Sequence, residues 1–236
     1  MRAFTSARIA IGRTGVSLPT EEILKFGLAH AKARDAVHTP LNESLLKEQL
    51  EQAGFDVQCV RSQADSRSIY LQRPDLGRSL AEACRPTLQA MRDVHTCIVV
   101  ADGLSALAVQ SHALPVLTSL REQLSLDWKN TPVVIAQQGR VAIGDDIGEA
   151  LNAQLVILLI GERPGLSSPD SLGAYITFAP RRGRTDAERN CISNIRPEGL
   201  PYAQAAFKIK WICDTALQLR LTGVSLKDES DLIKLN

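Results

Sequence analysis

The sequence lacks a large net charge of either sign. Its 27 lysines and arginines nearly balance 26 aspartates and glutamates, which gives a formal net charge of +1. A protein without a long-range basic field does not gather polyanions by electrostatic steering. A nucleic-acid partner is therefore not expected.

Recognisable cysteine motifs and long hydrophobic runs are also missing. The five cysteines form neither a C-x-x-C pair nor a cluster with histidine at zinc spacing; they are Cys59, Cys84, Cys97, Cys191 and Cys213. We expect reduced thiols in a cytoplasmic protein. The longest apolar run, residues 155–160, is too short to cross a bilayer, and the first residues lack the apolar core of a signal peptide. No membrane partner is expected.

Residues 1–92 have a polar, mainly helical pattern and predict a helical N-terminal lobe. Thr20 precedes two glutamates and can cap the start of a first helix. Asn42 can cap a second helix, and Gly54 can supply its left-handed end. A short strand at residues 55–60 follows.

Residues 93–236 change to short apolar runs that alternate with helix-length segments, which is typical of parallel strands joined by crossover helices. The expected strands are residues 97–101, 133–136 and 155–160, and the expected crossover helices are residues 105–126, which Pro115 should kink or interrupt, and 144–152. The predicted class is α/β: a Rossmann-like, largely parallel sheet with flanking helices, preceded by the smaller helical lobe.

The last third of the chain predicts one more strand and one more helix. A strand at residues 174–179 follows a loop with no obvious helix, so its direction stays open. Residues 202–222 predict a helix, with Pro201 near its start and Gly223 near its end.

In an open parallel sheet, ligands bind beyond the carboxyl ends of the strands. This rule selects three loops, residues 102–105, 137–145 and 161–166, and each carries glycine where the backbone must turn sharply or approach a ligand closely. The alternative is that these glycines simply end the strands.

The common catalytic and phosphate motifs are not found. No loop reads G-x-G-x-x-G after a strand, and Asp145 and Asp146 stand where a phosphate loop needs Lys and Ser or Thr. Neither G-x-S-x-G nor H-E-x-x-H occurs, and each histidine stands alone. We assign no catalytic residue and no metal ligand to this chain.

A polar segment at residues 181–194 predicts a helix that Thr185 and Glu188 would start as a capping box. Cys191 would lie on that helix. A solvated loop and a ligand contact are equally compatible with the segment.

Seven stretches, in order along the chain, are similar to those of the small (light) subunit of ethanolamine ammonia-lyase. They are SARI with GR (6–13), ARDAV (33–37), RPDLGR (73–78), DGLSA (102–106), QGRVAIGD (138–145), GERPGL (161–166) and RNCISNIR (189–196).

The resemblance implies a subunit of a radical lyase that converts ethanolamine to acetaldehyde and ammonia with adenosylcobalamin. The cofactor would lie between this chain and the large subunit of a hetero-oligomer, which is cytoplasmic or enclosed in a bacterial microcompartment. In the family dimethylbenzimidazole stays on cobalt. This agrees with the sequence, because Asp93 and His95 begin a D-x-H-x-x-G pattern in which Ile98 replaces the glycine.

The resemblance and the loops point to the same residues. We expect Val141, Glu162 and Cys191 to contact cobalamin, with Arg140 and the turn formed by Asp102, Gly103, Leu104 and Ser105 nearby. Val141 would pack on the corrin, Glu162 would accept an amide hydrogen, and Arg140 would donate to a carbonyl. Two alternatives stay open: an independent small enzyme for a nucleotide-like ligand, and a structural partner with an empty crevice.

Overall fold

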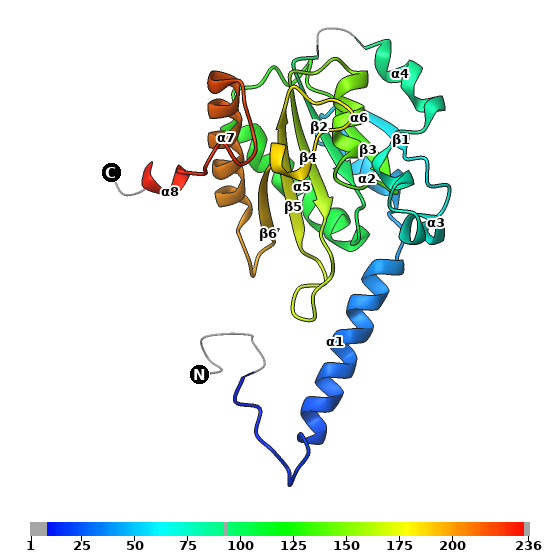
Figure 1. The fold of residues 1–236 in the computed structure, drawn as a ribbon, viewed down its shortest axis with the longest axis vertical. Coiled ribbons are helices and arrows are strands. Elements are labelled where there is room, and N and C mark those ends of the chain that lie inside the picture. The colour runs from blue at the N-terminus through cyan, green and yellow to red at the C-terminus, as the bar shows by residue number, and fades with distance from the viewer. Residues whose placement is uncertain (1–8, 92–93, 234–236) are drawn as a thin grey trace.

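The computed structural model describes residues 9–91 and 94–233, which contain a single six-stranded sheet (Figure 1). In chain order the strands are β1 (Val57–Arg61), β2 (Thr96–Ala101), β3 (Val133–Gln137), β4 (Leu155–Gly161), β5 (Leu172–Phe178) and β6 (Asn190–Ile195). Their order across the sheet is β1-β3-β2-β4-β5-β6. The predicted α/β class is confirmed.

β1, β3, β2 and β4 are parallel to one another. β5 pairs antiparallel with β4, and β6 pairs antiparallel with β5. β5 reverses direction because the loop that joins it to β4 contains no crossover helix, and a parallel connection needs one. β1 comes from the first ninety residues and pairs with β3. The N-terminal part therefore contributes a strand, and the division of the chain at residue 92 stays a prediction.

Helices cover the two faces of the sheet unequally. The helices are α1 (Thr20–His38), α2 (Glu43–Gln52), α3 (Arg67–Gln72), α4 (Arg85–Gln89), α5 (Ala106–Gln123), α6 (Ile143–Ala150), α7 (Tyr202–Leu219) and α8 (Ser230–Ile233). Alternate strand residues face opposite sides: Ile98 and Val100 pack with α2, α5 and α7, whereas Cys97 and Val99 pack with α6. The short α6 covers less of its face than the two long helices cover of theirs.

Two features of the helices differ from the local predictions. Pro115 does not interrupt α5, which continues from Ala106 to Gln123; Val116, Leu117 and other buried side chains hold the helix on the sheet and outweigh the lost hydrogen bond. Thr20 does not cap α1, because the N-cap is Pro19 and no side-chain cap forms.

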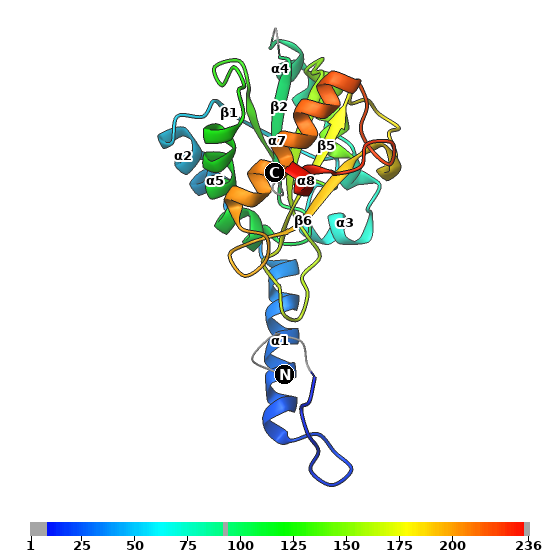
Figure 2. The ribbon, with the colours of Figure 1, turned by 90° about the vertical axis from the view of Figure 1, so that its left-hand side faces the viewer.

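α1 projects away from the body of the molecule (Figures 1 and 2). Its C-terminal end is attached, since Ala36 is buried and the carbonyl of Val37 accepts a 2.7 Å hydrogen bond from Arg67 Nε. Further from the body, Leu24 and Leu28 are 68% and 59% exposed. The helix thus presents apolar side chains to solvent.

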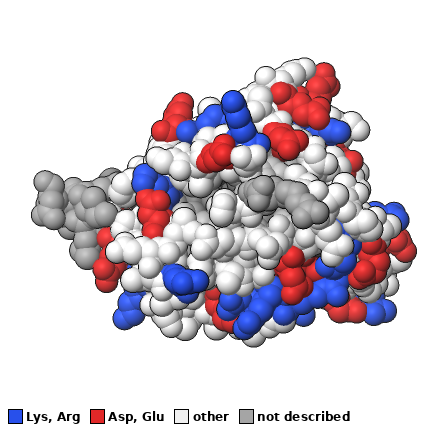
Figure 3. All heavy atoms as spheres, turned by 90° about the horizontal axis from the view of Figure 1, so that it is seen from above, with Lys and Arg blue, Asp and Glu red and all other residues white. Residues whose placement is uncertain are grey.

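Charge on the end of the molecule opposite α1 is mixed, with acidic and basic side chains interspersed around an uncharged middle (Figure 3). Of the helices within residues 9–91 and 94–233, none combines the length and the hydrophobicity needed to cross a bilayer.

Asn42 caps α2 as predicted, because its Oδ1 accepts a 3.1 Å hydrogen bond from Leu45 N. We expect Asn42→Ala to lower the free energy of unfolding by about 1 kcal/mol. Thr20→Ala should change it by less than about 0.5 kcal/mol, because no cap is lost. Urea denaturation of both variants tests the pair; equal losses would contradict the assignment.

Candidate functional site

The carboxyl ends of β3, β2 and β4 meet at one edge of the sheet, as the sequence predicted for the three loops that follow them. These strands are consecutive and parallel. Asp102 Oδ1 accepts a 2.9 Å hydrogen bond from Gly139 N, and Leu104 N donates to the carbonyl of Gly161 at 2.9 Å. The three loops are therefore joined directly to one another.

Glycine is needed here because the loops pack on each other. Gly103 has a φ of +56°, and a Cβ at this position would collide with the carbonyl oxygen of Gly161. A Cβ at Gly161 would in turn collide with the carbonyl oxygen of Ser105. Contact between loops explains these two glycines without any ligand.

Asp102 and Ser105 hold the turn from inside. Asp102 is 1% exposed and lies 3.4 Å from Arg67 Nη1, which also donates to the carbonyl of Gly103 at 2.8 Å. Ser105 caps α5 by accepting from Ala108 N, and it donates to a loop carbonyl. Their contact with a cofactor stays a prediction; their positions make them supports of the turn.

A cavity of about 410 Å³, which we call the crevice cavity, opens at this edge. Its lining residues are Tyr70, Gly103, Leu104, Arg140, Val141, Ile160, Gly161, Glu162, Arg163 and Tyr175. Five of the eight predicted residues thus share one wall, which are Gly103, Leu104, Arg140, Val141 and Glu162. The wall combines apolar surface, hydrogen-bond donors and one carboxylate.

Arg140 is fixed by the N-terminal part of the chain. Its amide donates to the carbonyl of Gly77 at 2.7 Å, and its Nη2 donates to the carbonyl of Tyr70 at 3.1 Å. The guanidinium lies 4.4 Å from the centroid of the Tyr70 ring. Sequence inspection missed Tyr70, because nothing in a short, isolated helix indicates that it reaches the strand ends.

Glu162 connects its loop to the two antiparallel strands. Its Oε2 accepts hydrogen bonds from Ser171 Oγ and, at 3.1 Å, from Asn194 N. Oε1 makes no such bond within the described residues, so it is free to accept a hydrogen from a ligand.

Cys191 lies on a strand, which corrects the prediction of a helix. The Thr185–Glu188 capping box forms, but it starts only a short 3-10 turn (Asp186–Glu188) before β6 pairs with β5. Cys191 stands opposite Tyr175 in this pairing and is exposed. Burial first, and then the neighbouring Cys191, raise the pKa of Tyr175, so its hydroxyl remains a donor at neutral pH.

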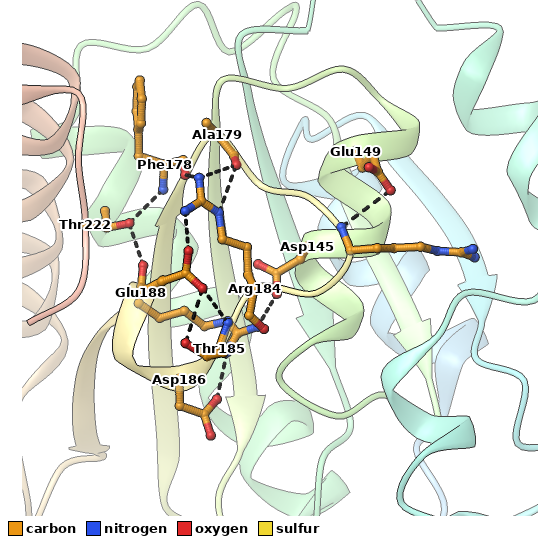
Figure 4. Close-up of polar contacts among 11 residues, drawn as sticks. Asp145, Glu149, Phe178, Ala179, Arg184, Thr185, Asp186, Glu188 and Thr222 are labelled. Atoms are coloured by element: carbon orange, nitrogen blue, oxygen red, sulfur yellow. Dashed lines mark hydrogen bonds and ion pairs between the residues drawn. The ribbon is translucent and has the colours of Figure 1, made fainter.

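The segment that resembles a phosphate loop has a structural role. Asp145 pairs with Arg189, and Asp146 pairs with Arg85 at 2.7 Å and with Arg182 at 2.8 Å. Figure 4 shows Asp145 among the side chains of the β5–β6 connection. These carboxylates therefore hold α6 to its surroundings.

Metal binding finds no support in the residues that the structure describes, which hold no group of three or more His, Cys, Asp or Glu side chains suited to an ion. His95 directly precedes β2 and so lies at the amino end of that strand, whereas the candidate site lies at the carboxyl ends. Asp93 lies outside the described residues.

Burial raises the pKa of Asp102 to about 6, against the lowering effects of Arg67 and of the Gly139 amide. The folded protein thus binds this proton at higher pH than the unfolded chain, so stability falls as pH rises through this window. Relative to Asp102→Asn, we expect the free energy of unfolding of the unsubstituted protein to fall by about 3 kcal/mol at most between about pH 4 and pH 6. Urea denaturation at several pH values measures the difference; a flat or rising curve would refute the assignment.

Comparison with known proteins agrees with the resemblance found in the seven stretches. The family Ethanolamine ammonia-lyase light chain (EutC) matches residues 1–227. The ethanolamine ammonia-lyase small subunit of Azotobacter vinelandii is 54% identical over 242 aligned residues, which cover 100% of this chain and 90% of that protein.

Two further relatives carry the same name. The Pseudomonas fluorescens protein is 53% identical and the alignment covers 98% of this chain and 87% of that protein. The Pseudomonas aeruginosa protein is also 53% identical, with 100% and 89% covered. The chain therefore belongs to the ethanolamine ammonia-lyase small-subunit family, a family of carbon–nitrogen lyase subunits.

Proposed function

We propose that this chain holds one side of adenosylcobalamin in the crevice cavity and that a large subunit covers the other side. The complex would deaminate ethanolamine to acetaldehyde and ammonia. The observation that carries the proposal is the joining of three strand ends around a cavity whose wall mixes apolar surface with donors and a carboxylate.

The wall fits the edge of a corrin. A corrin has an apolar rim studded with amides, so its binding site needs apolar surface, acceptors for N–H groups and donors for carbonyls. Val141 and Leu104 supply the apolar surface, and Glu162 Oε1 supplies an acceptor. Arg140 supplies a donor, because it lines the cavity and forms no ion pair with a carboxylate among the described residues.

The position of each residue permits a specific contact with the cofactor. Val141 packs against the ring, Arg140 and Tyr175 donate hydrogen bonds, and Glu162 accepts one while it anchors its loop. Cys191 extends the surface beside Tyr175, on the sheet face that α6 leaves open. When bound, adenosylcobalamin supplies a radical by breaking its cobalt–carbon bond, and the chain supplies position and exclusion of water.

A large partner follows from the size of the cavity and from α1. A cavity of about 410 Å³ holds only part of a cobalamin, so another surface must cover the remainder. The relatives are named small subunits. Exposed apolar side chains on a projecting helix mark an interaction site, and we place Leu24 and Leu28 of α1 in the interface. We also propose that the complex is located in the cytoplasm or in a bacterial microcompartment.

The alternatives receive less support. An independent enzyme needs a nucleophile or acid–base pair, and the described lining of the crevice cavity pairs no such groups. A purely structural partner does not explain why Glu162 lines the cavity with an Oε1 that accepts no hydrogen bond among the described residues.

Equilibrium dialysis against hydroxocobalamin tests the proposal. We expect retention by the complex with the large subunit and little retention by this chain alone. Glu162→Ala should weaken retention by the complex by roughly tenfold, because a hydrogen bond to a charged group is lost, and should leave subunit assembly intact.

Glu122→Ala is the matched control, since Glu122 is exposed on α5 at the other end of the sheet. Unchanged affinity in Glu162→Ala would remove Glu162 from the site. Ammonia-lyase activity from this chain alone would overturn the subunit assignment.

A further inference from the structure

Arg67, the first residue of α3, contacts two parts of the chain that are distant from each other in the sequence. Its Nε donates to the carbonyl of Val37 at 2.7 Å, and its Nη1 donates to the carbonyl of Gly103 at 2.8 Å. Val37 lies in the last turn of α1, whereas Gly103 belongs to the turn at residues 102–105 and lines the crevice cavity. One guanidinium therefore joins the projecting helix to the candidate site.

The same guanidinium is the counter-charge of Asp102. Nη1 of Arg67 lies 3.4 Å from Asp102 Oδ2, and the two side chains are 12% and 1% exposed. Among the described residues, Arg67 is the only ion-pair partner of Asp102. Because little water reaches the pair, removal of either partner leaves a charge that is costly to bury.

The geometry of these contacts needs arginine. The last carbonyls of an α-helix have no partner within the helix, and a cation is favoured at that end of the helix dipole. The planar fork of Arg67 can satisfy the Val37 carbonyl and reach the 102–105 turn at the same time, which a single ammonium group cannot do. The guanidinium also lies 4.7 Å from the centroid of the Tyr70 ring, which fixes its plane.

The other groups around Asp102 do not replace the charge of Arg67. Burial raises the pKa of Tyr70 to about 12, so this neighbour on α3 is neutral. Arg140, on the loop after β3, stacks on Tyr70, and Glu162, on the loop after β4, is hydrogen-bonded toward β5 and β6. The first turn of α5 carries no charged residue, and α1 faces Arg67 with a backbone carbonyl.

We infer that Arg67 is a positioning residue for the cofactor, because its guanidinium fixes the 102–105 turn and the end of α1 relative to each other. This inference rests on the proposed function, in which that turn forms part of the cobalamin wall and α1 lies in the interface with the large subunit. Arg67 does not itself line the crevice cavity, so it acts through the turn.

The test compares Arg67→Met, Asp102→Asn and the double variant with the unsubstituted chain, each in complex with the large subunit. Equilibrium dialysis against cyanocobalamin at about pH 6 and about pH 9 measures retention. At the higher pH, Arg67→Met should weaken retention by roughly tenfold, because Asp102 is then ionised without a counter-charge. At the lower pH the loss should be about threefold or less, because the carboxyl takes up a proton.

The double variant should recover most of the affinity at the higher pH, because neither charge of the buried pair is left alone. Arg67→Lys keeps the charge but not the planar fork, so any loss of retention should be similar at both pH values. Arg220→Met, on an exposed arginine at the end of α7, is the matched control and should retain cobalamin like the unsubstituted complex.

A loss in Arg67→Met that is equal at both pH values, or that Asp102→Asn does not reverse, would reduce Arg67 to a packing residue and overturn the inference. Urea denaturation of the same chains needs no cofactor, and at about pH 9 the midpoint that Arg67→Met lowers should be restored in the double variant. If the unsubstituted complex retains no cobalamin, the proposed function fails. The urea midpoints then decide alone whether the turn depends on Arg67, and no restoration would overturn that dependence as well.

Discussion

The hydrogen bond between the Asp102 carboxylate and the Gly139 amide is the contact on which the site depends. It joins the ends of β2 and β3, and the Leu104 amide joins the same turn to the end of β4. Asp102 is buried, so this bond operates away from water, where an unpaired polar group is costly. Arg67 adds the counter-charge and also holds the end of α1. One buried carboxylate thus connects the strand ends, the N-terminal segment and the projecting helix.

The unequal covering of the sheet gives the site its open side. Helices α2, α5 and α7 pack on one face, whereas α6, on the other face, is only eight residues long. Tyr175 and Cys191 consequently lie on an open face next to the strand ends. An enclosed pocket would suit a small ligand; an open edge and face suit a large flat one that a second protein also contacts.

Much of the fold could be predicted from the sequence, because buried parallel strands are continuous apolar runs and their order along the chain constrains the loops. The convergence of three loops followed from the same rule. The direction of β5 was left open, although the loop before it shows no helix and a parallel connection needs one. Cys191 was placed on a helix because the capping box was recognised, whereas pairing with β5 decides the conformation after Glu188. The contacts of Tyr70 and Gly77 with Arg140 join distant segments, which no local spacing reveals.

The most direct test of the account is the affinity for cobalamin of a complex that carries Gly103→Ala, compared with one that carries Gly183→Ala. Both glycines have positive φ, but a Cβ at Gly183 meets open space while one at Gly103 meets the Gly161 carbonyl. If the joined strand ends form the binding surface, the first substitution should weaken binding by roughly tenfold or more in a complex that still assembles, and the second should leave it nearly unchanged. Equal affinity in the two complexes would contradict the account.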